Sequence, residues 1–183
     1  MLSLNVRTAC AIVLIAASMF DLASNLMFTG RSVLKWFGES QIFLQWERGL
    51  LMAAFVLAAM GVSLLETLLG RAGGTVLPLT GATAFLVGAV VALVVEASFL
   101  SSGAHSTTPL EVTMVVVLFV AEALLGAAII ATSLLPAWVG WTIVAWDIAF
   151  LVVVTALSPG DIYYPALHFL PLTFIGVALL VMR

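Results

Sequence analysis

The sequence predicts an all-α fold, a polytopic membrane helical bundle with six transmembrane helices. Of its 183 residues, 64% are hydrophobic and only 8% are charged, and the mean hydropathy is +1.28. Soluble domains carry about a quarter charged residues, whereas an apolar run of about twenty residues is typical of a helix that crosses a membrane. Lipid offers backbone N–H and C=O groups no hydrogen-bond partner, so these runs are expected to be helical.

Clusters of polar residues, glycine and proline separate six apolar runs of about 20–25 residues, each long enough to cross about 30 Å of hydrocarbon. The first run follows Arg7 and continues past Asp21 to Phe28. This is longer than the apolar part of a cleaved signal peptide and favours a retained first span. The pattern predicts one transmembrane domain, residues 1–183, with spans near 8–29, 45–69, 76–100, 111–135, 137–157 and 162–182.

The connections between the spans differ in character. The longest, residues 30–49, mixes aromatic and aliphatic residues with Arg31 and Lys35. That pattern predicts an amphipathic segment lying in the membrane interface between helices 1 and 2, or an N-terminal extension of the second span. In contrast, "LLPAWVGW" (134–141) is so short that spans four and five must form a tight hairpin, with Pro136 at a helix start.

Charge and motifs exclude several function classes. A net charge of −3 with six dispersed basic residues argues against a nucleic-acid partner. A single cysteine, Cys10, excludes an internal disulfide and suggests no metal framework, although the sequence leaves metal binding undecided. Of the two histidines, His105 falls in a Ser/Thr-rich loop, so only His168 lies within a span, where it would allow one axial ligand to a haem. No Walker A, HExxH, CxxC or GxSxG motif is present, so we predict no cofactor.

The expected surroundings are the lipid bilayer, with further protein subunits or a second copy of the chain as protein partners. Basic residues tie at three on each side of the membrane, so the positive-inside rule does not decide orientation. An N-terminus inside would leave the uncharged or acidic loops 101–110 and 158–161 outside, which is the orientation we expect. The predicted location is the inner membrane of a bacterial cell.

Acidic residues inside the apolar runs hold most of the functional information. An ionised carboxylate at the bilayer centre costs about 2.5–3.5 kcal/mol on insertion scales, so each needs a partner or a proton. Helical spacing puts each acid on a face with small or polar residues, which points it into the bundle. These faces are Ser18, Asp21 and Asn25; Gly81, Gly88, Ala92 and Glu96; Glu122 and Gly126; and Gly140 and Asp147.

Depth along the predicted spans groups these residues. Arg48 begins span two, and His168 lies between Pro165 and Pro171, which are expected to loosen the helix and free backbone carbonyls. The six-span arrangement puts Arg48, Glu96 and His168 in one leaflet. We therefore predict an ion, proton or small-ligand site that opens outward, with Glu122 and Asp147 as a deeper relay; its residues are Asp21, Asn25, Glu47, Arg48, Glu96 and His168. In the other interpretation, each acid is protonated and hydrogen-bonds locally across the bundle.

The second half of the chain resembles a family of bacterial polytopic membrane proteins catalogued as a domain of unknown function. The similarity rests on a span, a short "LP-x-W-x-GW" turn, another span and a closing helix that contains proline and ends in a basic residue. The matching residues are Leu135, Pro136, Trp138, Gly140, Trp141, Pro171 and Arg183. The resemblance covers about half the chain and implies no activity, so it transfers no functional residues.

Three functions fit these observations. The first is a small proton- or cation-coupled transporter or channel-like protein, since ionisable residues within a membrane mark functional sites by default. The second is a non-catalytic accessory or assembly subunit of a larger membrane complex, whose acids hydrogen-bond between helices. The third is an intramembrane enzyme acting on a lipid, with His168 and Glu96 as an acid–base pair. The sequence favours a non-enzyme.

Overall fold

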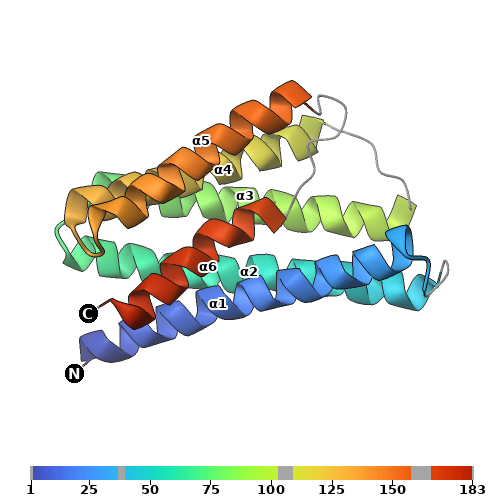
Figure 1. Cartoon of the computed structure of the whole chain (residues 1–183), viewed down its shortest axis with the longest axis horizontal. Helices are drawn as coiled ribbons and strands as arrows, with labels where there is room; N and C mark the ends of the chain where they lie inside the picture. The colour runs from blue at the N-terminus through green and yellow to red at the C-terminus, as the bar shows by residue number, and fades with distance from the viewer. Residues whose placement is uncertain (1, 37–39, 103–108, 158–165, 183) are drawn as a thin grey trace.

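The computed structural model describes residues 2–36, 40–102, 109–157 and 166–182, and these residues form a bundle of helices (Figure 1). The predicted all-α architecture with six helices is confirmed. Both ends of the chain lie at the same end of the bundle, as an even number of spans requires. The elements are α1 (Leu2–Phe28), η1 (Thr29–Val33), α2 (Gln41–Arg71), α3 (Val76–Ser102), α4 (Pro109–Thr132), α5 (Ala137–Leu157) and α6 (Ala166–Val181).

Helix length and composition fit an integral membrane protein. Within the described residues, four stretches are long and apolar enough to cross a membrane: Val6–Val33, Gln41–Arg71, Val76–Leu100 and Pro109–Thr132. The apolar helical stretches of the last two helices are shorter, Ala137–Val153 and Leu167–Val181. At 1.5 Å per residue, α2 is about 46 Å long, so it extends beyond a hydrocarbon layer of about 30 Å.

The connection between α1 and α2 takes the second of the two predicted arrangements. Residues 29–33 prolong α1 as a π-helical turn, and residues 41–49 form the first turns of α2. Residues 37–39 lie outside the described part. Trp36 and Trp46 at this end are 72% and 64% exposed, as expected for side chains that anchor a helix at the membrane interface.

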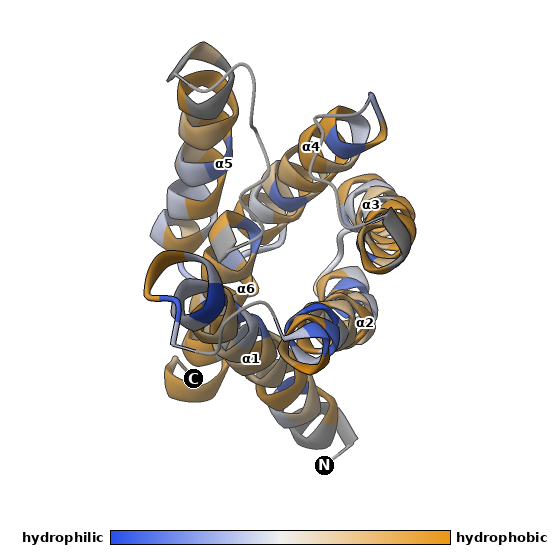
Figure 2. Ribbon diagram, turned by 90° about the vertical axis from the view of Figure 1, so that its right-hand side faces the viewer, coloured by the Kyte–Doolittle hydropathy of each residue, from blue (hydrophilic) through white to orange (hydrophobic). Residues whose placement is uncertain are grey.

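From α1 to α5 each helix packs against the next one around the bundle, and α6 returns to pack chiefly on α1 (Figure 2). On α1 the inward face carries Cys10, Ala11, Leu14 and Ala17, all fully buried. Leu14 lies three or four residues from each of the others, which is the spacing that puts residues on one face of a helix. The fifth helix, α5, packs chiefly on α4 and lies at the edge of the bundle (Figure 1).

Glycines allow the helices that carry the acids to approach closely. The predicted small-residue face of α3 is confirmed: Gly88 abuts Leu118 of α4, where a Cβ would lie 2.7 Å from a leucine methyl carbon. The α4–α5 crossing is tighter still. A Cβ on Gly140 would lie 2.5 Å from the Gly126 carbonyl oxygen, so neither position accepts a side chain without separating the helices. This crossing brings Glu122 and Asp147, on the same two helices, toward each other.

The described part of α6 begins about halfway along the bundle rather than at its far end (Figure 1). Its 16 residues span about 24 Å. Residues 162–165 of the predicted sixth span lie outside the described residues. His168, the third residue of α6, therefore lies near mid-depth, which decides its partners below.

Candidate functional site

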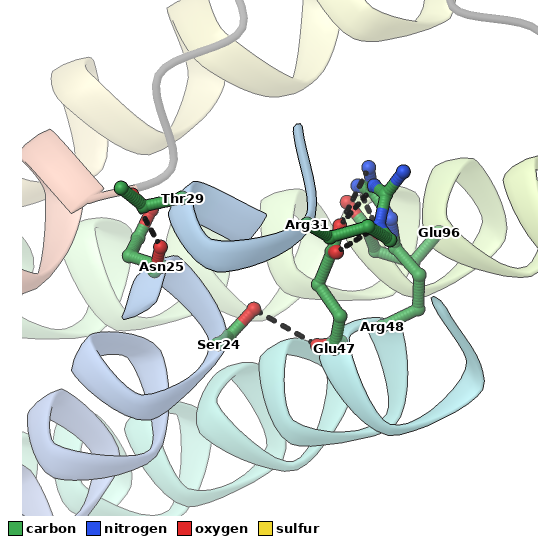
Figure 3. A network of polar contacts seen from close by, with 7 residues as sticks. All are labelled: Ser24, Asn25, Thr29, Arg31, Glu47, Arg48 and Glu96. Carbon is green, nitrogen blue, oxygen red and sulfur yellow. Dashed lines mark hydrogen bonds and ion pairs between the residues drawn. The ribbon is translucent and has the colours of Figure 1, made fainter. Parts of the chain in front are cut away.

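A buried network of ion pairs joins α1, α2 and α3 at the end of the bundle opposite the termini (Figure 3). Arg48 is its centre: Nη1 lies 3.0 Å from Glu96 Oε2, and Nη2 lies 3.2 Å from Glu47 Oε1. The side chains of these three residues are at most 5% exposed. The guanidinium also lies over the ring of Phe99, 4.4 Å from its centroid, in a cation–π contact.

Arg31 completes this network, and the sequence prediction did not include it. Its Nε donates to Glu47 Oε2 at 2.8 Å, and its Nη2 donates to Glu47 Oε1 at 3.0 Å. This two-point contact is the strongest geometry for an arginine and a carboxylate. The π-helical turn η1 carries Arg31 back over α2, while Ser24 Oγ donates to the Glu47 carbonyl oxygen at 2.8 Å. We call Arg31, Glu47, Arg48 and Glu96 the ion-pair cluster.

Glu111, in the first turn of α4, lies beside the ion-pair cluster and was also missed from the sequence. It is only 4% exposed and is near enough to Glu96 for the two carboxyls to interact electrostatically. The sequence placed Glu111 at the boundary of a span, where an acid needs no special explanation. Only the convergence of the ends of four helices shows that it belongs to this region.

Two buried carboxylates facing two guanidinium groups make the ion-pair cluster close to electroneutral. Removing charges from water is costly, and that cost is offset only when partners and hydrogen bonds are in place. The cluster meets this condition for Glu47 and for most of Arg48. Within the described residues, Arg48 Nε and Glu96 Oε1 remain without a hydrogen bond. The ion-pair cluster is therefore suited to holding the helix ends together.

Asp21 and Asn25 form a local pair on α1. Asn25 Nδ2 donates to Asp21 Oδ1 at 2.8 Å and to the Asp21 backbone oxygen at 2.9 Å. Asp21 is 5% exposed, so the predicted inward polar face of span one is confirmed. One turn further along, Thr29 Oγ1 donates to the Asn25 carbonyl oxygen at 2.8 Å (Figure 3). Asp21 is thus bonded within its own helix.

A second group, Glu122, Asp147 and His168, lies in the middle of the bundle and is here called the deep cluster. Each residue comes from a different helix, α4, α5 and α6 respectively, and each is 1% exposed. Glu122 interacts directly with Asp147, and its Oε2 lies 3.8 Å from His168 Nδ1. The His168 ring packs on Phe119, with centroids 4.2 Å apart.

The polar atoms of the deep cluster are unusual because they are not satisfied. The carboxyls of Glu122 and Asp147 have each other, but no other described residue donates to their four oxygens, and neither ring nitrogen of His168 has a well-formed hydrogen bond within the described residues. Buried polar atoms in folded proteins nearly always have a partner. Two interacting carboxyls in apolar surroundings also cannot both be ionised at reasonable cost. The arrangement is therefore suited to holding a proton between them.

The structure corrects the predicted grouping of site residues. His168 was expected beside Arg48 and Glu96, but it contacts Glu122 instead. The physical reason is that α6 begins near mid-depth, which places its third residue below the helix ends. His168 and Glu96, the predicted acid–base pair of a lipid-modifying enzyme, each have another partner: His168 lies beside Glu122, and Glu96 is bound to Arg48.

Two surface hollows in the described part have other linings. One of 270 Å³ lies between α2 and α3 and is almost wholly apolar, and one of 500 Å³ lies beside Arg7 and the α4–α5 turn. Arg7 itself donates to the carbonyl oxygens of Leu179 and Met182 near the end of α6. The described residues contain no group of three or more His, Cys, Asp or Glu arranged to hold a metal ion.

Comparison with protein-family models, with curated proteins and with solved structures finds no match to this chain. The resemblance of the second half to a bacterial membrane family stays a prediction. Inference about function therefore depends on the geometry of the two clusters.

Proposed function

We propose that this protein is a small transporter or channel-like protein that moves protons, alone or coupled to a small cation, with the deep cluster as its proton-binding group. One observation carries the proposal. The carboxyls of Glu122 and Asp147 contact each other with His168 beside them, and no other described residue hydrogen-bonds their oxygens or the His168 ring nitrogens, at the depth where a charge is most costly. The ion-pair cluster differs in degree, because only Arg48 Nε and Glu96 Oε1 lack a hydrogen bond there within the described residues.

The chemistry of the deep cluster suits a proton as its occupant. Its donors come from three helices, and they include one imidazole and two carboxyls. An imidazole can accept a proton on one nitrogen and release one from the other, and a carboxyl pair can share one. The His168 Nδ1 to Glu122 Oε2 distance of 3.8 Å is long for a direct hydrogen bond and short enough to close with a small movement of α6.

The ion-pair cluster takes a different role in this proposal from the one the sequence predicted. Glu96 is bound to Arg48 and Glu47 to both arginines, so neither is free to bind a transported cation. Instead the cluster would hold the ends of α1, α2 and α3 together above the deep cluster. We place the protein in the inner membrane of a bacterium, as the resemblance of its second half implies.

An accessory subunit of a larger membrane complex is the second candidate, and one observation favours it. Asp21, Glu47 and Glu96 are each bonded to a neighbour within the chain, as expected of acids that serve only to join helices. Purification in a mild detergent separates the candidates. A partner of fixed stoichiometry would support the accessory role, and a single monodisperse chain would count against it.

Proton uptake into liposomes tests the proposal directly. Purified protein is reconstituted with a pH-sensitive dye inside, and a membrane potential drives proton entry. The variants are Glu122→Gln and Asp147→Asn, each of which removes one acid from the deep cluster. Glu66→Gln is the matched control, because Glu66 lies near the other end of α2 and belongs to neither cluster.

We expect the wild type to take up protons faster than empty liposomes, and the control to match the wild type. Both deep-cluster variants should lose uptake by at least about tenfold, because a general acid–base group contributes about 10²–10⁴-fold to proton transfer. Wild-type uptake no faster than that of empty liposomes would contradict the proposal. Equal uptake by the wild type and both deep-cluster variants would contradict the role of the cluster.

A further inference from the structure

One backbone carbonyl next to the deep cluster lacks its normal helical partner. Pro171 lies inside α6 and has no N–H to donate. In an α-helix the N–H of residue 171 would bond to the carbonyl of Leu167, four residues earlier. That carbonyl oxygen instead accepts a hydrogen bond from Trp146 Nε1 of α5 at 3.1 Å. The proline thus opens a binding point on α6, and a tryptophan of the neighbouring helix occupies it.

The two residues joined by this bond are direct neighbours of the deep cluster in sequence. Trp146 precedes Asp147, and Leu167 precedes His168. We infer that Trp146 is a positioning residue, whose indole N–H fixes α6 against α5 so that His168 faces Glu122 and Asp147. The inference rests on the proposed function for the importance of that placement, but the placement can be measured without any transport.

The surroundings of α6 explain why one hydrogen bond matters here. The last helix packs mainly on α1, where Ser18 Oγ donates to the Phe169 carbonyl oxygen at 3.2 Å, and it makes only a slight contact with α5. The indole itself is held within α5 by Phe150, whose ring centroid lies 4.3 Å away. The Trp146 indole is therefore a rigid donor on α5, and its hydrogen bond joins two helices that otherwise make little contact.

The experiment distinguishes two roles of the Trp146 N–H: holding α6 against α5, and merely giving the Leu167 carbonyl a hydrogen-bond donor. Trp146→Phe keeps an aromatic ring and removes the N–H. Adding Pro171→Ala to that variant supplies an N–H within α6 for the Leu167 carbonyl, but it does not restore the tie to α5. Trp141→Phe is the matched control, because Trp141 lies on the same helix and is 61% exposed.

The readout is the ¹⁵N spectrum of the histidine rings of the full-length protein in micelles. The chain has two histidines, and His105→Gln assigns the signals of His168. We expect Trp146→Phe to move the His168 ring signals and to lower proton uptake about fivefold, the scale of one net hydrogen bond. The control should leave both unchanged. The double variant should recover thermal stability while the His168 signals and the uptake stay altered.

Two results would overturn the inference: unmoved His168 signals in Trp146→Phe, or wild-type signals in the double variant. If Trp146→Phe does not fold, Pro171→Ala alone serves, since it gives the Leu167 carbonyl a competing donor and straightens α6; unmoved His168 signals would again overturn the inference. Moved signals in a protein whose wild type carries no protons would leave the positioning role standing and contradict only the proposed function.

Discussion

The carboxyls of the ion-pair cluster and of the deep cluster are similarly buried, yet only those of the first cluster face guanidinium groups. Arg31 and Arg48 contact Glu47 and Glu96 at 2.8–3.2 Å. In the deep cluster, the one basic side chain beside Glu122 and Asp147 in the described part of the chain is the His168 imidazole, 3.8 Å from Glu122. Opposite charges hold the first group together, whereas the second is stable only if it carries little charge.

Depth explains the difference. The ion-pair cluster is built from the end of α1, the start of α2 and the end of α3, and α2 is about 16 Å longer than the hydrocarbon layer. Charges at such a helix end lie near lipid headgroups and water, where they are cheaper to retain. Glu122 and Asp147 lie near the middles of α4 and α5. At that depth two ionised carboxylates would cost too much free energy, so the pair must be neutral or share a proton.

The largest expected effect comes from breaking the ion-pair cluster at its centre. Arg48→Met leaves Glu96, which is fully buried, without its cation. We expect a loss of about 3–5 kcal/mol in the free energy of unfolding, the range found when one member of a buried ion pair is removed. Unfolding by SDS in mixed micelles measures it.

The double variant Arg48→Met, Glu96→Leu sharpens this test. It removes the pair as a whole and leaves Glu47 bound to Arg31, so most of the lost stability should return. If the single variant loses less than about 1 kcal/mol, the pair is no more than a weak surface contact, and the contrast between the clusters fails.

A smaller loss in the free energy of unfolding is expected from separating α4 and α5, the helices that carry Glu122 and Asp147. Gly140→Ala places a methyl carbon 2.5 Å from the Gly126 carbonyl oxygen and pushes α5 away from α4. Overpacking of this kind costs about 1–3 kcal/mol. Gly49→Ala is the matched control, because nothing lies within 4 Å of a Cβ there. Equal stability of the two variants would contradict the close crossing that brings Glu122 and Asp147 together.

The smallest effect is expected at the rim of the ion-pair cluster. The Arg31 side chain is 22% exposed, and Glu47 keeps Arg48 when Arg31 is lost. We therefore expect Arg31→Gln to cost about 1 kcal/mol or less in the same SDS titration. A loss as large as that of Arg48→Met would show that η1, rather than Arg48, is the centre of the cluster.

The helices and their inward faces could be predicted from the sequence because both follow local periodicity. The predicted limits lie within a few residues of most helix ends, and the face of Gly81, Gly88, Ala92 and Glu96 is buried. The partners could not be predicted, because they depend on depth. Arg31 reaches Glu47 only through a π-helical turn, and His168 meets Glu122 only because α6 begins near mid-depth.

The central claim is that the deep cluster, unlike the ion-pair cluster, holds a proton, and infrared spectroscopy of the protein in lipid nanodiscs tests it most directly. We expect the C=O band of a protonated carboxyl at neutral pH in the wild type and in Glu96→Gln. The same band should persist in Asp21→Asn and be lost when the double variant Glu122→Gln, Asp147→Asn is made in that background, because Asp21 is another buried acid whose side-chain partner is an amide. A band that persists in this triple variant, or that disappears in Glu96→Gln, would contradict the account.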